Sequence, residues 1–372
     1  MDNNSSNLPN NSCVSTFSEA QIKSILITYG SVGGLATLIC FTGLCLAISL
    51  KLWRQFVYRL AICQVTAALF IGISRTMQLP LMLADEEDAL YNRLCKAIAF
   101  SVVTGDWIKL LFTLWIAVYL FVYSVFLTKT LKKCEYAVIP VFTITGLLVA
   151  SVPLITDTYG KAGAWCWIKN KRDTCPHEVL LEGEIEQFAL WFGPALFMLL
   201  LNSLLVVITM IVMAYRLCCP KKQAGESVTS DTTPLLETNR KALLLLLPLL
   251  AYPLIYCILI IIPLINRFYQ IISHESSFGM FFTCAVLIPG VSFSAGTAFL
   301  IHIAVLERKK LCHGFGICKK RQNRNGLAIN STGTVERDAE QQSDDDPLKV
   351  TRASSTHTVT VDESEIEKQL FP

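Results

Sequence analysis

The sequence predicts an all-α integral membrane protein, a bundle of seven transmembrane helices with its N-terminus outside and its C-terminus in the cytosol. The chain of 372 residues is 53% hydrophobic and only 16% charged, which is too apolar for a soluble domain of this size. Crossing a bilayer takes ~20 mostly apolar residues. Five stretches without any Asp, Glu, Lys or Arg exceed that length: residues 24–50, 136–156, 187–215, 242–266 and 276–301.

Two further apolar stretches, 57–83 and 95–127, are as long but carry internal charges, which brings the count to seven. The predicted helices lie at about 25–50, 57–83, 95–127, 136–156, 187–214, 242–265 and 278–304. They form one transmembrane domain, 25–304. An extracellular tail, 1–24, precedes this domain. A juxtamembrane amphipathic helix, 305–320, and a disordered, polar cytosolic tail, 321–372, follow it.

The charges of the loops predict the orientation, because cytosolic loops are enriched in Lys and Arg. The loops around Arg54, Lys132 and Arg308 are basic. The alternate loops are acidic, and residues 157–186 hold six acidic side chains against four basic ones. The N-terminal tail is therefore assigned to the outside. Three glycosylation sequons in this tail agree with that side, with acceptors Asn3, Asn4 and Asn10.

Four cysteines fall on the outer side, and four cysteines allow three pairings. Cys95 begins the third helix and Cys166 lies in the middle of the second outer loop. We expect a bridge between these two, which would hold the loop as a lid over the mouth of the bundle. Trp165 and Trp167 flank Cys166, and indole rings favour this interface. Cys13 and Cys175 then remain for each other.

Seven helices, an outer N-terminus and this bridge together resemble a G-protein-coupled receptor. The stretch "WCW", 165–167, looks like the Cys-Trp of secretin-type and slime-mould cyclic-AMP-type receptors. "RKALLLLLPLL", 240–250, resembles the start of a secretin-type sixth helix. "AYPLIYCILIIIPLINRFY", 251–269, is similar to the sixth helix of the cyclic-AMP-receptor-like group. "FVYRLAICQVTAALF" and "LWIAVYLFVYSVF" fit the same group, and the resemblance covers roughly 25–312.

Motifs that are absent from this sequence argue against two other groups of receptors. The third helix ends "VYSVFLTK" without Asp-Arg-Tyr, and the seventh lacks Asn-Pro-x-x-Tyr. These departures predict that the chain is not a rhodopsin-type receptor. About 24 residues precede the first helix, too few for the cysteine-rich ectodomain of secretin-type receptors. The cyclic-AMP-receptor-like group, class E-like and related to class B, therefore fits best.

Three charges lie inside predicted helices, where charge is costly and marks candidate functional positions. At ~1.5 Å per residue, Asp106 lies ~16 Å below Cys95 and Arg75 lies ~12 Å below the outer end of its own helix. Arg75 and Asp106 could therefore pair, and Lys109 shares a face with Asp106. One interpretation is a structural ion pair. The other is a net positive pocket for an anionic ligand, with Trp165 and Trp167 as further ligand candidates.

Other side chains in the helices receive simpler interpretations. Pro248, Pro253 and Pro263 are predicted to form a hinge in the sixth helix, because proline removes backbone hydrogen bonds. Three aromatic residues are predicted to pack only: Trp107, Tyr119 and Tyr123. His302 is predicted to be a hydrogen-bonded residue at the inner interface.

The cytosolic end carries candidate modification sites. Cys312 and Cys318 are predicted palmitoylation sites by position. Ser354, Ser355 and Thr356 are candidate phosphorylation sites in the tail, and such a cluster suits receptor kinases and arrestin-like partners.

The resemblance implies a plasma-membrane receptor that transduces an extracellular signal, expected to be small and anionic, to heterotrimeric G proteins by movement of the sixth helix. Arrestin, receptor kinases, a small ligand and membrane lipid are the expected partners, with no nucleic acid, no metal and no cofactor. No enzymatic motif is found, so no catalytic activity is expected. The alternative function is a multi-pass transporter or channel, although no internal repeat supports it.

Overall fold

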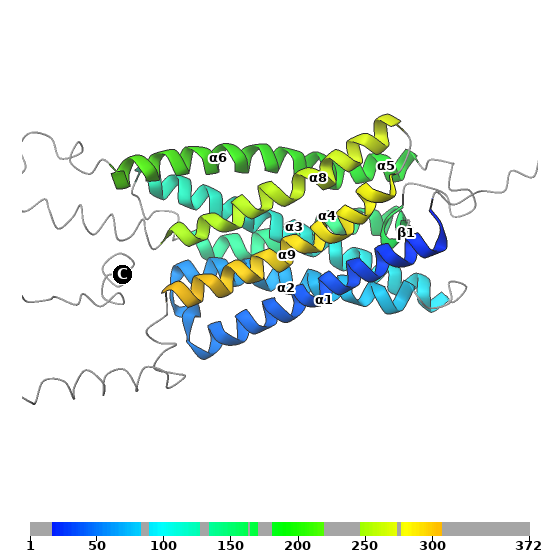
Figure 1. The fold of residues 1–372 in the computed structure, drawn as a ribbon, viewed down its shortest axis with the longest axis horizontal. Coiled ribbons are helices and arrows are strands. Elements are labelled where there is room, and N and C mark those ends of the chain that lie inside the picture. The colour runs from blue at the N-terminus through cyan, green and yellow to red at the C-terminus, as the bar shows by residue number, and fades with distance from the viewer. Residues whose placement is uncertain are drawn as a thin grey trace, which may run out of the picture. The chain divides into compact units, whose positions relative to one another are not determined.

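The computed structural model of the chain describes residues 17–82, 89–126, 134–162, 164–169, 181–218, 246–273 and 277–306. The chain divides into two units, Met1–Ile303 and Ala304–Pro372, and the packing described below belongs to the first. Seven helical spans in the described residues are long and apolar enough to cross a membrane (Figure 1). The predicted fold class, an all-α bundle of seven such helices, is confirmed.

The helices of the bundle are α1 (Glu19–Ser49), α2 (Phe56–Met82), α3 (Ala89–Phe126), α4 (Glu135–Ile155), α5 (Leu181–Gln187), α6 (Gly193–Cys218), α8 (Ala251–Ser273) and α9 (Phe278–Leu306). Two short 3₁₀ turns, η1 (Leu52–Arg54) and η6 (Leu247–Leu250), precede α2 and α8. A π-helical turn, η3 (Phe188–Phe192), joins α5 to α6, so these three elements make one span. Two strands, β1 (Tyr159–Ala162) and β2 (Trp165–Ile168), lie between α4 and α5.

Several helices begin before the apolar stretch that predicts them. The first starts at Glu19 because Ser18 and Gln21 form a capping box, in which each side chain bonds the other's backbone N–H. The third starts at Ala89 rather than at Cys95. Hydropathy marks only the part of a helix that lies in lipid, whereas caps and polar turns extend the helix beyond it.

Small residues bring α1, α2 and α3 close together. A Cβ atom added to Gly72 of α2 would lie 2.7 Å from the Thr37 hydroxyl of α1. One added to Gly105 of α3 would lie 2.5 Å from Cγ1 of Ile71 in α2. Glycine is therefore required at both contacts, and it lets the side chains of α2 reach α3 next to Asp106.

The outer faces of the bundle helices are apolar. Large hydrophobic side chains are exposed on α4 and α6, among them Leu148, Ile155, Leu200 and Ile211. In water such faces would drive aggregation, but they match the hydrocarbon core of a bilayer. In that core the backbone polar groups must be hydrogen-bonded within the protein, as they are in helices.

The three prolines of the sixth span occupy different positions. Pro248 lies in the 3₁₀ turn η6, and Pro253 lies in the first turn of α8. Neither position removes a bond from the interior of an α-helix, because the first-turn N–H groups have no partner within the helix. Only Pro263 lies inside α8. Of the three prolines predicted to form a hinge, Pro263 is therefore the one inside α8.

Many of the predicted sites lie outside the described residues. They are Asn3, Asn4, Asn10, Cys13, Cys175, Cys312, Cys318, Ser354, Ser355 and Thr356, together with nearly all of the tails, 1–24 and 305–372.

Candidate functional site

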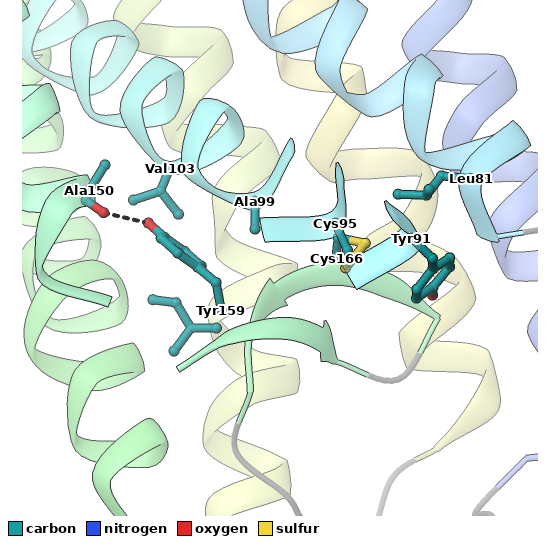
Figure 2. Close-up of a cluster of buried hydrophobic side chains, with 9 residues drawn as sticks. Leu81, Tyr91, Cys95, Ala99, Val103, Ala150, Tyr159 and Cys166 are labelled. Atoms are coloured by element: carbon teal, nitrogen blue, oxygen red, sulfur yellow. Dashed lines mark hydrogen bonds between the residues drawn. A yellow bond between two sulfur atoms is a disulfide. The ribbon is translucent and has the colours of Figure 1, made fainter. Parts of the chain in front are cut away.

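Strands β1 and β2 form an antiparallel hairpin that covers one end of the bundle, with Tyr159 opposite Ile168 and Lys161 opposite Cys166. We call residues 157–162 and 164–169 the lid. The Tyr159 side chain is buried and donates a hydrogen bond of 2.9 Å to the carbonyl of Ala150 in α4 (Figure 2). The predicted disulfide is confirmed, since Cys166 is bonded to Cys95 of α3 with their Cα atoms 5.3 Å apart.

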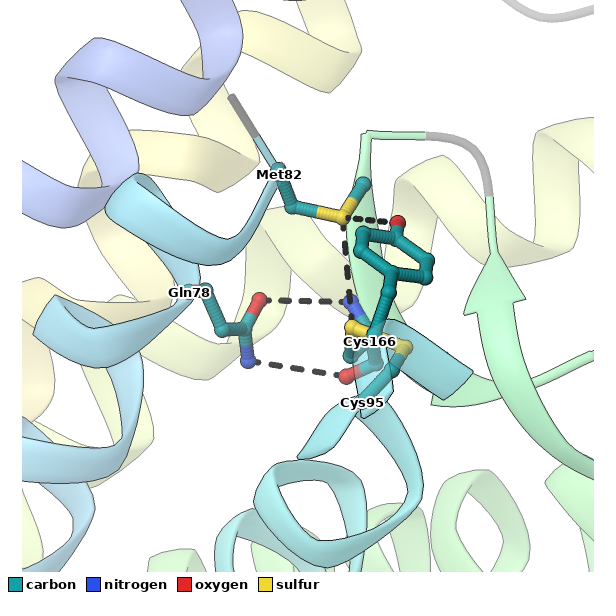
Figure 3. Close-up of a disulfide and its surroundings, with 5 residues drawn as sticks. Gln78, Met82, Cys95 and Cys166 are labelled. Carbon is teal, nitrogen blue, oxygen red and sulfur yellow. Dashed lines mark hydrogen bonds between the residues drawn. A yellow bond between two sulfur atoms is a disulfide. The ribbon is translucent and has the colours of Figure 1, made fainter. Parts of the chain in front are cut away.

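The backbone of Cys166 is also held by α2. Gln78 accepts a hydrogen bond from the Cys166 N–H at 3.3 Å and donates one to its carbonyl at 3.5 Å (Figure 3). Gln187 of α5 donates to the carbonyl of Ile168 at 2.6 Å. The lid is therefore fixed to α2, α3, α4 and α5, by side chains far apart in the sequence.

The two tryptophans beside Cys166 pack against different parts of the bundle. Trp165 stacks between Tyr29 of α1 and Phe281 of α9, with ring centroids 5.4 and 5.0 Å apart. Trp167 meets Trp191 and Phe192 of the π turn edge to face. The sequence "WCW" thus contacts α1 and α9 through Trp165, α2 and α3 through Cys166, and η3 through Trp167.

Two ionisable groups on the lid have shifted pKa values. A hydrogen bond and charge attraction from the Lys96 ammonium lower the pKa of the Asp157 carboxyl. Burial, with a smaller effect from Glu186, raises the pKa of the Tyr159 hydroxyl. Asp157 is therefore ionised and Tyr159 is neutral at physiological pH.

The three charged residues singled out in the sequence meet in the middle of the bundle. Nη2 of Arg75 donates to both carboxylate oxygens of Asp106 at 3.0 Å. Nζ of Lys109, one helical turn along α3, donates to Oδ1 of Asp106 at 3.1 Å. Arg75 is 1% exposed, Asp106 8% and Lys109 5%. We call these three residues the charge cluster.

Arg75 makes two further contacts, to α9 and to α1. Its Nη1 donates to the carbonyl of Ile288 in α9 at 2.8 Å, and its guanidinium lies 5.8 Å from the centre of the Tyr29 ring. Tyr29 in turn stacks on Trp165 of the lid. The charge cluster is therefore connected to the lid through a single aromatic side chain.

A cavity of about 30 Å³ adjoins the charge cluster, room for about two water molecules. All three charged residues line it. The opposite walls are apolar and aromatic and come from α3, η3, α6, α8 and α9. They include Trp107, Trp191, Tyr256, Ile260 and Ile288. The cavity thus combines two cations and one anion with apolar walls.

Three of these lining residues were not expected from the sequence to be functional. Trp107, predicted to pack only, lines the cavity and donates its indole N–H to the carbonyl of Leu190 in the π turn at 2.8 Å. Trp191 and Tyr256 also face it. Trp165 and Trp167, predicted as ligand candidates, are absent from its lining and pack in the lid. Trp191 and Tyr256 lie within long apolar stretches. Hydropathy therefore does not distinguish them from side chains that only pack.

His302 differs from its sequence interpretation. It is 1% exposed, stacks on Tyr58 of α2 with centroids 4.8 Å apart, and neither ring nitrogen has a hydrogen-bond partner among the described residues. It is therefore a packed side chain between α2 and α9 rather than a hydrogen-bonded interfacial one.

Comparison of the sequence with protein-family models and with curated proteins finds no match. Among solved structures, the crystal structure of squid rhodopsin is similar, with a TM-score of 0.58 over 91% of this chain and 94% of that chain, at 13% sequence identity. This similarity shows the fold, a seven-helix bundle of the rhodopsin kind. The distinction from rhodopsin-type receptors and the relation to the cyclic-AMP-receptor-like group rest on the sequence motifs and stay predictions.

Proposed function

We propose that the chain is a G-protein-coupled receptor of the plasma membrane that transduces a small extracellular signal. One observation carries the proposal above all others. A seven-helix bundle with the fold of squid rhodopsin holds a charged cavity in its middle, beneath a disulfide-bonded lid. Ligand sites between the helices of a bundle are concave, mostly apolar and marked by a few polar groups, and this cavity has that composition.

The disulfide supports the proposed orientation. Disulfides persist in oxidising compartments and are rare in the cytosol, so the end of the bundle that carries the lid is assigned to the outside. The start of α1 lies at this end, where Phe17 contacts Phe281 and Tyr29 contacts Trp165 (Figure 1). With seven spans, the end of α9 then lies in the cytosol, as the loop charges predict.

The ligand is proposed to carry an anionic group, because the charge cluster has a net charge of +1. Arg75 uses both carboxylate oxygens of Asp106 and the carbonyl of Ile288, so it is a structural cation. Lys109 makes a single hydrogen bond and is the cation that can bind a ligand carboxylate or phosphate. Trp165 and Trp167 are proposed to shape access to the cavity.

Transduction is proposed to use α8, with Pro263 as the hinge. The cavity touches α8 at Tyr256 and Ile260, so a ligand there bears directly on the helix that must move. On the cytosolic side a heterotrimeric G protein is the proposed partner. Receptor kinases and arrestin acting on the tail, with palmitoylated cysteines after α9 and a glycosylated N-terminus, complete the proposal.

A panel of G-protein activation sensors in cells tests this function. The chain is expressed with an outer epitope tag so that surface level is measured in the same cells. We expect activation of at least one Gα family, either without ligand or on addition of small organic anions. Surface display without activation of any family would overturn the proposal and favour a transporter or channel.

A further inference from the structure

The buried charges of the bundle do not balance. Arg75 and Lys109 are the buried basic side chains of the described residues, and Asp106 is the one buried acidic side chain there. Arg75 and Lys109 both donate hydrogen bonds to Asp106, whose single negative charge balances only one of them. One positive charge therefore has no counter-charge within the described protein. An unbalanced charge in a membrane-embedded site is costly.

The nearest thiol does not supply the missing negative charge. Cys40 lies close enough to Lys109 for their charges to interact, but its Sγ donates a hydrogen bond to the carbonyl of Ser292 at 3.6 Å. A thiol that donates is protonated and neutral. The compensating charge must therefore come from outside the described chain.

The cavity beside Lys109 offers donors and little space. An ammonium carries three N–H donors, and Lys109 uses one of them, on Asp106. The Tyr256 hydroxyl, in the cavity wall, makes no hydrogen bond to any residue that the structure describes. With room for about two water molecules, the cavity favours a small anion over a bulky one. A chloride ion is somewhat larger than a water molecule and accepts hydrogen bonds from several donors at once.

We propose that this cavity is a binding site for a monatomic anion, chloride under physiological conditions, which neutralises Lys109 when no ligand is bound. Two donors of Lys109 and the Tyr256 hydroxyl are its direct ligands, and the remaining walls are largely apolar. The site rests on the geometry of the charge cluster and does not require that the chain couples to G proteins. An agonist with an anionic group would displace the ion.

Thermal unfolding of the purified chain in an uncharged detergent tests the site. Chloride is exchanged for gluconate at constant ionic strength, and unfolding is followed by tryptophan fluorescence. An ion that binds only the folded state raises the unfolding temperature with the logarithm of its concentration. Above the dissociation constant we expect a rise of roughly 2–5 °C for each tenfold increase in chloride. Bromide should replace chloride, and the larger sulfate ion should replace it less effectively.

Lys109→Met and Lys96→Met make a matched pair of variants in α3. Lys96 is a lysine of the same helix, but it is half-exposed and pairs with Asp157 on the lid. We expect Lys109→Met to lose the chloride dependence and to be more stable than the wild type in gluconate, because it leaves the neutral Arg75–Asp106 pair. Lys96→Met should keep the full chloride dependence.

Two results would overturn the site. One is a wild-type unfolding temperature that is the same in chloride and in gluconate. That result is expected if Lys109 is neutral or if the cavity holds only water. The other is a chloride dependence that survives in Lys109→Met. Should that variant fail to fold, crystals of the wild type grown in bromide decide the matter, because the site requires anomalous density within hydrogen-bond distance of Lys109 Nζ.

Discussion

Asp106 accepts hydrogen bonds from two buried cations at once, so the three side chains of the charge cluster do not contribute equally to stability. Removing Arg75 or Lys109 leaves one cation paired with one carboxylate. Removing Asp106 leaves two cations facing each other in a low-dielectric site. The carboxylate is therefore the residue on which the cluster depends most.

We predict that, in a chloride buffer, Asp106→Leu destabilises the protein most, Arg75→Leu less and Lys109→Met least. Removing one partner of a buried pair costs about 3–5 kcal/mol in comparable settings, and Asp106→Leu leaves two cations without a partner. Arg75→Leu also removes the bond to the Ile288 carbonyl. Unfolding temperatures of the purified variants, with surface levels in cells, give the order. Asp106→Leu as stable as Lys109→Met would contradict the charge account.

The sequence predicts that the three charged residues lie close together, but it does not predict which of them bond to Asp106. Counting residues along α2 and α3 puts Arg75 and Asp106 at similar depth, and the i, i+3 spacing puts Lys109 on the same face. A simple Arg75–Asp106 pair predicts that the double variant to leucine recovers most of the lost stability. The structure bonds Lys109 to the same carboxylate, so that double variant leaves Lys109 bare and full recovery needs Lys109→Met as well.

We predict that Gly105→Ala lowers stability by about 1–3 kcal/mol, the usual cost of overpacking. The added methyl would lie 2.5 Å from Cγ1 of Ile71 and would push α2 away from α3 beside the charge cluster. Gly290→Ala in α9 is the control, because nothing lies within 4 Å of its new methyl and alanine favours the helix. Equal unfolding temperatures for the two variants would argue against close packing at Gly105.

Among the elements, the lid is held by one covalent bond and by several side chains from different helices. Gln78 and the Tyr159 hydroxyl hold it to α2 and α4 independently of the disulfide, and the two tryptophans pack against different helices. Loss of the disulfide should therefore weaken the lid without releasing it.

We predict that Cys166→Ala lowers the free energy of unfolding by about 2–5 kcal/mol and reduces surface display. Cys45→Ala is the matched control, because Cys45 is a free and exposed cysteine of α1. Flow cytometry with an outer tag measures display for both. Normal display and an unchanged unfolding temperature in Cys166→Ala would mean that the bond contributes little.

The sixth span gives a prediction about motion. Pro263 is the proline inside α8, whereas Pro253 lies in its first turn. We predict that Pro263→Ala restores a backbone hydrogen bond, stiffens α8 and reduces maximal G-protein activation at equal surface level. Pro253→Ala should restore no helical bond and change activation less. If Pro263→Ala signals as well as the wild type, α8 does not bend there during activation.

At the scale of the whole molecule, hydropathy was sufficient to predict the seven spans, because the bilayer imposes length and polarity on each span. The disulfide followed from topology, since few cysteines lie on the outer side. The cavity walls could not be predicted in this way. Trp107, Trp191 and Tyr256 lie on three separate spans, and their convergence depends on a π turn and on glycine contacts that leave no periodic pattern.

Nucleotide exchange on purified G proteins tests the central claim, that this bundle is a receptor, most directly. The purified chain is reconstituted in lipid nanodiscs and mixed with a heterotrimer of each Gα family, so that no other receptor is present. The account predicts that at least one heterotrimer exchanges nucleotide faster than with empty nanodiscs, and that Asp106→Leu at equal folded concentration loses this effect. Exchange at the rate of empty nanodiscs for every heterotrimer, with and without small organic anions, would contradict it.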